Sequence, residues 1–282
     1  MTAVVVELVT YPVKGCAGVA VAASPLGAAG LAHDRTFMAV TEEGTFRSQR
    51  RDPRLALVRP EITADGGRLT LRAPGMEPLD LAVDLGAERR GVELFGAAYQ
   101  GIDQGPDAAG WLSEFLGAPS RLVRVPPEHD RVTGGLTRGT SGYADGSPVH
   151  LVSRASLDGL NARLAEAGRP PLPMDRFRPN IVVDGRDGPH AEDAVRSARA
   201  GTAELAFAKL AIRCAVTMVD QRRGAKDGPE PLRTLAAYRR ADGGGVAFGT
   251  KFSVVRPGAL AVGDAFLVTE WSREAAQARS GA

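Results

Sequence analysis

The chain has few cysteines and no long apolar run. Its 282 residues include two cysteines, Cys16 and Cys214, which cannot form a disulfide framework, and no CxxC or Cys/His cluster indicates structural zinc. Two isolated thiols favour a reducing compartment, and we expect a cytoplasmic location. No window approaches the roughly 18 apolar residues of a membrane-spanning helix, and the N-terminus lacks a basic segment before an apolar core. The sequence therefore predicts a protein without a membrane anchor.

An excess of charge of one sign is also lacking. The 35 Lys and Arg residues nearly balance 33 Asp and Glu residues, so no overall field would attract nucleic acid or an anionic membrane. Arginine outnumbers lysine, however, and arginine holds carboxylates and phosphates in a bidentate fashion. Local sites for anions therefore remain open.

Several well-known catalytic and nucleotide motifs are missing. No GxGxxG or GxxxxGK[ST] stands at a strand-to-helix junction, which disfavours nucleotide-binding folds. No GxSxG accompanies the four histidines, which sit in unrelated contexts. A hydrolytic triad is therefore disfavoured as well.

What the chain does contain is enough apolar sequence for a large core. Hydrophobic residues make up 44% and charged residues 24%, as in soluble globular proteins, and the length suits two lobes. Strand patterns dominate and helical patterns intervene irregularly, which favours a mostly β, α+β or barrel-like fold over regular βαβ winding. We expect strands at 4–10, 36–41, 45–48, 68–73, 121–125, 180–183, 205–208, 210–219, 246–248, 252–256 and 266–268.

Three helices are predicted between these strands. Asp107 caps the first and Gly117 stops it, and Ser153 caps the second, which ends before Gly168. The third is short and lies within 230–240. The stretch 133–148, "TGGLTRGTSGYADGSP", reads as a long loop, and such loops in compact domains tend to be functional or mobile.

The stretch 211–224, "AIRCAVTMVDQRRG", raises the question of what Cys214 does. In a strand, alternation would place Cys214 on one face with Leu210, Ile212, Val216 and Met218. On that pattern the thiol is a small buried hydrophobe. The alternative is that it binds a ligand.

Four strings interrupt strand-like segments with polar residues that a packed core does not require. Each carries a cation, a hydrogen-bonding side chain or a thiol beside apolar residues. Taken singly, Lys14 and Arg35 are explained as surface charges, Arg178 as half of an ion pair and Cys214 as core. The strings are "TYPVKGCAG", "GLAHDRTFMAV…FRSQRRDPRLALVRPEI", "MDRFRPNIVV" and "IRCAVTMVDQRRG".

Together and in this order, the strings resemble the molybdenum cofactor sulfurase C-terminal (MOSC) domain family. The resemblance is to the branch with an N-terminal β-barrel partner, which includes amidoxime-reducing molybdenum enzymes, and it extends over "GYADGSPVHLVSRASLDGLN", "EPLRTLAAYRR" and "FGTKFSVVRPGALAVGD". It implies an N-terminal β-barrel-like domain at 1–118, a MOSC β-barrel domain with flanking helices at 119–270, and a tail at 271–282.

The resemblance implies a metal ligand. Cys214 would be the protein thiolate on a molybdenum ion whose other sulfurs come from the dithiolene of a pyranopterin, and soft sulfur suits such a centre. Arg213 beside it would favour the ionised thiol. A bulge or an inward-facing position would turn the cysteine towards the cofactor. Asp220 matches a family position near the metal, or alternatively holds the turn that starts at Gln221.

The matching positions also imply donors for the anionic pyranopterin phosphate. Arg178 precedes a proline, and we expect this to hold it extended at the entrance to a strand. Lys14 would act as a point charge and the arginines as bidentate donors. The implied cofactor-binding residues are Lys14, Arg35, Ser141, Arg178, Asn180, Arg213 and Thr217.

The activity implied is reduction of N-hydroxylated compounds such as amidoximes and hydroxylamines by oxygen-atom transfer, with the molybdenum cofactor (molybdopterin). The sequence has no cysteine set for an iron–sulfur cluster, so a separate ferredoxin, flavoprotein or cytochrome would supply electrons. The alternative is a carrier of the molybdenum cofactor or of sulfur that has no reductase turnover of its own. Gly15, Met218, Gln221 and Lys251 depart from the family pattern and bear on substrate range.

Overall fold

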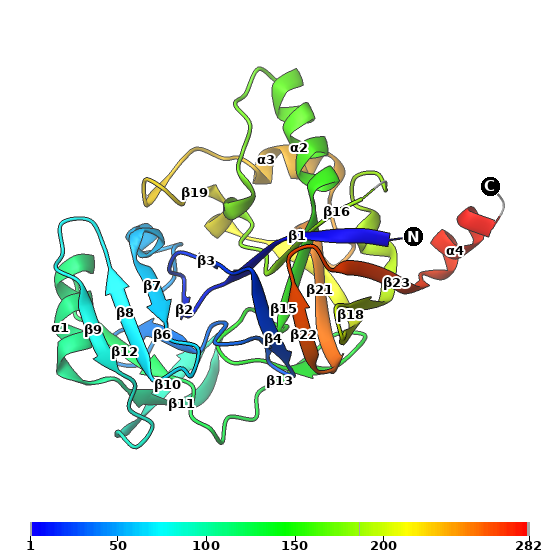
Figure 1. Cartoon of the computed structure of the whole chain (residues 1–282). Helices are drawn as coiled ribbons and strands as arrows, with labels where there is room; N and C mark the ends of the chain where they lie inside the picture. Colours follow the sequence, from blue (N-terminus) through cyan, green and yellow to red (C-terminus); the bar gives the residue numbers. More distant parts are fainter. Residues whose placement is uncertain (1, 186, 281–282) are drawn as a thin grey trace.

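The computed structural model of the chain describes residues 2–185 and 187–280. Strands dominate it and the helices are few and scattered, which confirms the α+β, mostly β, fold class. Figure 1 shows two bodies side by side, a barrel and a smaller lobe of sheets with helix α1 (Gly105–Leu116) on its outside. Among the described residues, no helix is long and apolar enough to cross a membrane.

The larger body is a closed barrel. Its strands run in the order β16, β15, β21, β18, β17, β23 and β1, and a further pairing of β1 with β16 closes the ring. Closure leaves no free strand edge in the ring. The strands are β1 (Thr2–Thr10), β15 (Val149–Ser153), β16 (Ile181–Asp184), β17 (Val195–Ala200), β18 (Ala203–Arg213), β21 (Val246–Arg256) and β23 (Ala265–Trp271).

The start of the chain is part of this barrel. Strand β1 runs antiparallel to both β16 and β23, and its Val5 and Leu8 are buried in one core with Leu151 and Phe252. The register of β1 shifts between Val5 and Glu7, so Val5 and Leu8, which are three positions apart, can both face the core. The chain then crosses into the smaller lobe directly after β1, so residues at this crossing lie between the two bodies.

The smaller lobe has two sheets. One runs in the order β10, β11, β12, β6 and β2, and the other in the order β7, β8 and β9. Helix α1 packs Trp111, Leu112 and Phe115 against this core. The strands are β2 (Val13–Lys14), β6 (Phe37–Val40), β7 (Arg59–Ile62), β8 (Arg68–Arg72), β9 (Leu79–Ala82), β10 (Arg89–Leu94), β11 (Ala97–Asp103) and β12 (Arg121–Arg124).

Short elements join and flank the two bodies. Strand β22 (Gly258–Ala261) pairs with β4 (Ala23–Gly27), which ties late and early parts of the chain together. The others are β3 (Val19–Ala20), β5 (Gly30–Leu31), β13 (Val132–Thr133), β14 (Gly139–Thr140), β19 (Val219–Asp220), β20 (Ala225–Lys226), the helices α3 (Leu232–Tyr238) and α4 (Arg273–Ser280), and the 3-10 turns η1 (Pro53–Leu57), η2 (Met174–Arg176), η3 (Ala191–Ala194) and η4 (Ala215–Met218).

The helix-end predictions are partly confirmed. Ser153 caps α2 (Arg154–Glu166) by accepting a hydrogen bond from the Ser156 backbone, and Gly117 ends α1 (Gly105–Leu116) in the left-handed region. The prediction that Asp107 caps α1 is wrong. The N-cap of α1 is Gln104, three residues earlier, because Pro106 suits the first turn, so Asp107 lies inside that turn.

The predicted strand at 210–219 is wrong beyond Arg213. Strand β18 is continuous from Ala203 to Arg213, and its last pairing joins Arg213 to Val246, the first residue of β21. Without a partner beyond that point, the chain leaves the sheet at Cys214 and enters η4. The predicted burial also fails, since Ile212 is 48% exposed and Cys214 is exposed. Cys214 is therefore not a core residue.

Three other strand predictions need correction. The separate strands at 246–248 and 252–256 are one strand, β21. Residues 45–48 form no strand. Phe46 meets β6 through an isolated bridge to Val40, the Arg47 backbone donates to the Ala39 carbonyl at 2.8 Å, and Thr45 bridges to Glu93 of β10.

Arg178 is not extended. Its φ is +55°, in the left-handed region, and its backbone N–H bonds the Asp175 carbonyl at 3.2 Å. It therefore closes the η2 turn instead of leading straight into β16, a conformation that costs free energy for any residue with a β-carbon.

Candidate functional site

A cleft of about 400 Å³ lies between the two bodies. Its walls combine the segment after β1, the 46–50 loop, the 144–147 loop and the end of β18. The volume is in the range of small-molecule and cofactor sites. Of the predicted site residues, the cleft brings together Lys14, Arg35, Arg178, Asn180, Arg213 and Cys214.

The cleft is strongly cationic. Eight basic side chains line it against one acid, Asp145. Such an arrangement raises the local concentration of anions, although the chain as a whole carries a formal charge of only +2. The eight are Lys14, Arg35, Arg47, Arg50, Arg131, Arg178, Arg213 and Lys251.

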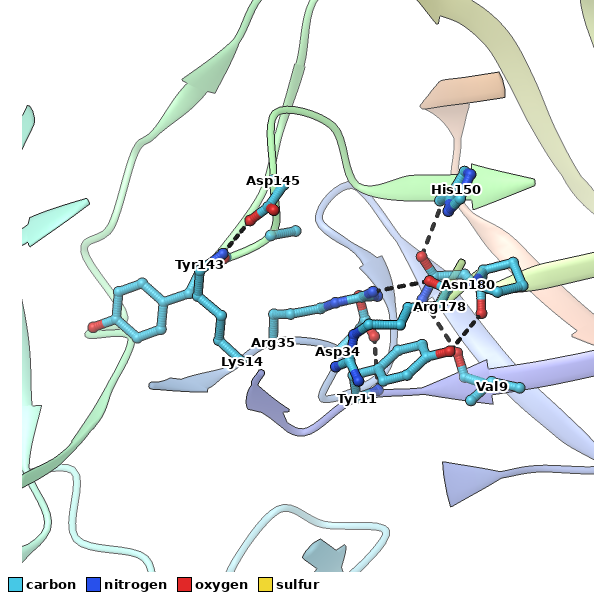
Figure 2. Close-up of polar contacts among 12 residues, drawn as sticks. Val9, Tyr11, Lys14, Asp34, Arg35, Tyr143, Asp145, His150, Arg178 and Asn180 are labelled. Atoms are coloured by element: carbon cyan, nitrogen blue, oxygen red, sulfur yellow. Dashed lines mark hydrogen bonds and ion pairs between the residues drawn. The ribbon is translucent and has the colours of Figure 1, made fainter. Parts of the chain in front are cut away.

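Tyr11 organises two of these arginines (Figure 2). Its ring has the Arg35 guanidinium carbon 4.1 Å and the Arg178 guanidinium carbon 4.2 Å from its centroid. Asp34 holds Tyr11 and Arg35 together, because its carboxylate accepts hydrogen bonds from the Tyr11 backbone at 2.8 Å and from the Arg35 guanidinium at 2.6 Å. Burial raises the pKa of Tyr11 to about 12, so the ring stays neutral between the cations.

Arg35 and Arg178 share an unusual backbone. Both have positive φ, +47° and +55°, and Arg35 donates a hydrogen bond to the Arg178 carbonyl at 3.3 Å. Burial lowers the pKa of Arg178. Arg35 pairs with Asp34, whereas the buried Arg178 side chain donates to the neutral Gln221 amide. Two residues with such strained backbones are stable only if the surrounding contacts enforce them, and such strain clusters at ligand sites.

Lys14 and Lys251 both donate hydrogen bonds to Asp145, the one acid that lines the cleft. Lys14 donates to the Tyr143 carbonyl at 2.9 Å and pairs with the Asp145 carboxylate, and Lys251 donates to the Asp145 carbonyl. Burial raises the pKa of Asp145, but the charges of Lys14 and Lys251 outweigh it and hold that pKa well below its usual range. Burial lowers the pKa of Lys14, and lowers that of Lys251 to about 7.

Asn180 is held between two barrel strands (Figure 2). Its carbonyl oxygen accepts from the His150 backbone at 3.2 Å and its amide donates to the Val9 carbonyl at 3.2 Å. Burial, with Arg213 adding to it, lowers the pKa of His150 well below its usual value. The imidazole is therefore neutral near pH 7.

Cys214 stands at the edge of the cleft at the point where β18 ends. Its side chain is exposed and its backbone carbonyl accepts hydrogen bonds from the Thr217 hydroxyl at 2.9 Å and the Thr217 backbone at 3.0 Å. Arg213 donates to the Phe177 carbonyl at 2.9 Å, and its Nε has no hydrogen-bond partner among the described residues. A buried donor left free beside an exposed thiol is the pattern of a ligand site.

The other predicted site residues, Ser141, Thr217 and Asp220, do not line the cleft. Thr217 is buried and secures the turn after Cys214. Ser141 is buried and its hydroxyl accepts a 3.3 Å hydrogen bond from Arg131, which does line the cleft. Asp220 accepts from the Arg222 and Arg223 backbones at 2.8 and 2.9 Å. These contacts agree with the alternative in which Asp220 holds the turn that starts at Gln221.

A pair of glutamines links the two bodies beside the cleft. Gln49 donates to the Gln221 carbonyl oxygen at 2.9 Å, and Gln221 donates back to Gln49 at 2.8 Å. The same Gln221 oxygen accepts from Arg178 at 3.3 Å. Gln221, which departs from the family pattern, thus helps to fix a cleft arginine.

Sequence reasoning missed the cleft residues Gln49, Arg131, Asp145 and His150, and it missed Tyr11, which packs on two cleft arginines without lining the cleft itself. Asp145 lies in the stretch 133–148 that was predicted to be a functional or mobile loop, and Tyr11 lies two residues before Val13 in a string already singled out. No sequence pattern shows that Asp145 meets two lysines, because those contacts span more than a hundred residues.

The cleft offers few protein ligands for a metal. Among residues 2–185 and 187–280, no group of three or more His, Cys, Asp or Glu side chains could hold an ion. A metal bound here would therefore depend on a non-protein group for most of its ligands.

Comparison with known proteins identifies two family models in the chain. The "MOSC N-terminal beta barrel domain" matches residues 2–119 and the "MOSC domain" matches residues 138–266. Mitochondrial amidoxime reducing component 2 of Rattus norvegicus is 37% identical over 90% of this chain and 80% of its own length. Mitochondrial amidoxime-reducing component 1 of Homo sapiens is 34% identical, over 92% and 81%.

A third relative is longer. Molybdenum cofactor sulfurase of Danio rerio is 32% identical over 86% of this chain, which corresponds to 31% of the relative. On these matches, which cover both bodies, the chain belongs to the MOSC domain family, in the branch that carries the MOSC N-terminal beta barrel domain.

Proposed function

We propose that the chain binds a molybdenum cofactor in the cleft and reduces N-hydroxylated compounds, such as amidoximes and hydroxylamines. The observation that carries the proposal is the exposed Cys214 thiol at the edge of a cleft lined by eight cations and one acid. The names of the relatives that match 80% or more of their own length support the same reaction class.

The residues of the cleft fit an anionic, sulfur-bound molybdenum group. A single thiol suits a metal whose other ligands come from the cofactor, and soft sulfur suits molybdenum. Arg35 and Arg178, aligned on Tyr11, and the Lys14 ammonium are donors for a phosphate group. The free Nε of Arg213 is a further donor beside the thiol.

The reaction converts an N–OH group into N–H and water and consumes two electrons and two protons. When bound, the molybdenum cofactor supplies the two-electron chemistry that breaks the N–O bond. The chain's own part is to hold the anionic group with Arg35 and Arg178 and to keep a proton on Lys251 Nζ. The pKa of that amine, about 7, suits proton exchange near neutral pH.

Electrons would come from a separate ferredoxin, flavoprotein or cytochrome, and we place the reaction in the cytoplasm on the basis of the two free cysteines. Cell fractionation with an antibody against the chain tests the location.

The function is tested with protein made in a host that synthesises the cofactor. We expect close to one molybdenum per chain by mass spectrometry and turnover of benzamidoxime with reduced methyl viologen. Cys214→Ser should abolish turnover, whereas Cys16→Ala, which removes the buried thiol, should retain it. Protein without molybdenum would contradict the proposal, and molybdenum without turnover under any donor would favour the carrier alternative.

A further inference from the structure

Two arginine-rich segments from the two bodies lie against each other beside the cleft. They are "QRRDPR" at 49–54 and "QRRGAK" at 221–226, and the reciprocal hydrogen bonds of Gln49 and Gln221 join them. The contact is close, because a β-carbon on Gly224 would lie 2.6 Å from the Leu57 side chain and 3.3 Å from the Arg54 backbone. The segments therefore form one continuous surface.

This surface, which we call the basic ridge, carries six exposed cations. None of the six forms an ion pair with an acid in the described part of the chain. The acids within the two segments are already engaged, since Asp52 pairs with Arg47 at 2.9 Å and Asp220 accepts two backbone N–H groups. The six are Arg50, Arg51, Arg54, Arg222, Arg223 and Lys226.

Some exposed arginines elsewhere are paired with acids. Arg68 pairs with Asp80 at 3.1 Å, and Arg256 pairs with Glu204 at 2.7 Å. Since the whole chain has a formal charge of only +2, the ridge is a local excess of positive charge. Such an excess steers an acidic partner towards one place on the surface.

The ridge borders the cleft from both sides. Arg50 is itself part of the cleft wall. On the other body, the segment that begins at Cys214 runs through η4 and β19 directly into Arg222. A protein docked on the ridge would therefore lie against the segment that carries the thiol.

We propose that the basic ridge is the docking surface for the electron donor, and that the donor is a small acidic one-electron carrier protein, for which an acidic [2Fe–2S] ferredoxin serves as the probe. The inference rests on the proposed reductase function. Each docking event delivers one electron, so two successive events supply the two electrons that convert N–OH and two protons into N–H and water. The position beside the cleft favours a redox partner over a nucleic acid or a lipid surface, neither of which the reaction uses.

The test compares two double variants of the holoenzyme. Arg51→Glu/Arg223→Glu reverses two ridge charges that do not line the cleft, and Arg68→Glu/Arg199→Glu makes the same change in net charge away from it. Benzamidoxime reduction is driven by an acidic [2Fe–2S] ferredoxin or by reduced methyl viologen. We expect the ferredoxin-supported kcat/KM to fall at least about tenfold at low ionic strength in the ridge variant only.

The same variants are titrated with ferredoxin in a direct binding assay, which reads docking without turnover. We expect wild-type binding to weaken with salt and the ridge variant to bind at least about tenfold more weakly. Turnover with both donors left unchanged in the ridge variant, equal losses in both variants, or no ferredoxin binding to the wild type would overturn the proposal. Ridge-dependent binding of phosphatidylglycerol vesicles or of DNA in place of ferredoxin would also overturn it. Absence of viologen turnover in the wild type would instead contradict the reductase function.

Discussion

The cleft and the η3 turn both contain buried charges, but the two regions differ in how completely those charges are paired within the chain. At η3, Glu192 accepts hydrogen bonds from the Ser153 and Ser156 hydroxyls at 2.9 and 2.7 Å, and Asp193 pairs with Arg239. In the cleft, eight cations line the wall with one acid, only Arg35 and Arg47 pair with acids behind it in the described part of the chain, and Arg213 keeps a free Nε. A network completed within the chain stabilises the fold, whereas an incomplete one has a cost that a ligand of opposite charge can offset.

The largest effect is expected from removing a cleft cation. Arg178→Met should lower molybdenum occupancy by about 10- to 100-fold, the range of one or two lost charge-assisted hydrogen bonds. The stability of the cofactor-free protein should change little, because burial already disfavours this charge. Metal analysis and urea unfolding measure the two quantities, and Arg199→Met, which is exposed, is the control. Full occupancy in Arg178→Met would remove Arg178 from the cofactor site.

The η3 turn should show the reverse pattern. Glu192→Ala leaves the Ser153 and Ser156 hydroxyls without their buried partner, so we expect a loss of about 2 to 3 kcal/mol in the free energy of unfolding. Molybdenum occupancy per folded chain should stay at the wild-type value. Urea unfolding of the cofactor-free protein measures the loss, and Glu192→Gln should lose less because it keeps an acceptor. Loss of molybdenum from the folded Glu192→Ala variant would contradict the claim that the η3 turn stabilises the fold without contributing to cofactor binding.

The smallest effect concerns pH. The folded pKa of Lys251, about 7, lies below its ordinary value of 10.5 because the side chain is buried. Between these values the unfolded chain binds a proton that the folded chain does not, so stability should rise with pH. We expect Lys251→Met to reduce this rise by about 1 kcal/mol between pH 7 and pH 9.5, after allowance for solvent screening. Urea unfolding of the cofactor-free proteins at both pH values measures it, and an unchanged rise would contradict the low pKa.

Sequence patterns correctly predicted helix ends that depend on residues close together in the chain. Ser153 caps α2 because its hydroxyl meets an N–H three residues along, and Gly117 ends α1 because glycine tolerates a positive φ. The prediction that Asp107 caps α1 was wrong because Pro106 occupies the first turn of that helix. The end of β18 could not be read from alternation, since it depends on where β21, over thirty residues later, begins to pair.

The sequence predicted which segments contribute to the candidate site, but not how their side chains contact one another. The resemblance placed Lys14, Arg35 and Arg178 in one site, and the structure brings them to one cleft. The contact of the Arg178 guanidinium with the Tyr11 ring joins residues more than 160 positions apart, so no local pattern shows it. The roles of Cys214 and of the cleft cations remain predictions that the measurements above address.

The most direct test of the central claim is X-ray absorption at the molybdenum edge of the purified protein and of Cys214→Ser. The account predicts that the wild type shows one more sulfur neighbour of molybdenum than the variant, and that Cys16→Ala matches the wild type. The same number of sulfur neighbours in wild type and Cys214→Ser would contradict it, because Cys214 would then not be the protein ligand.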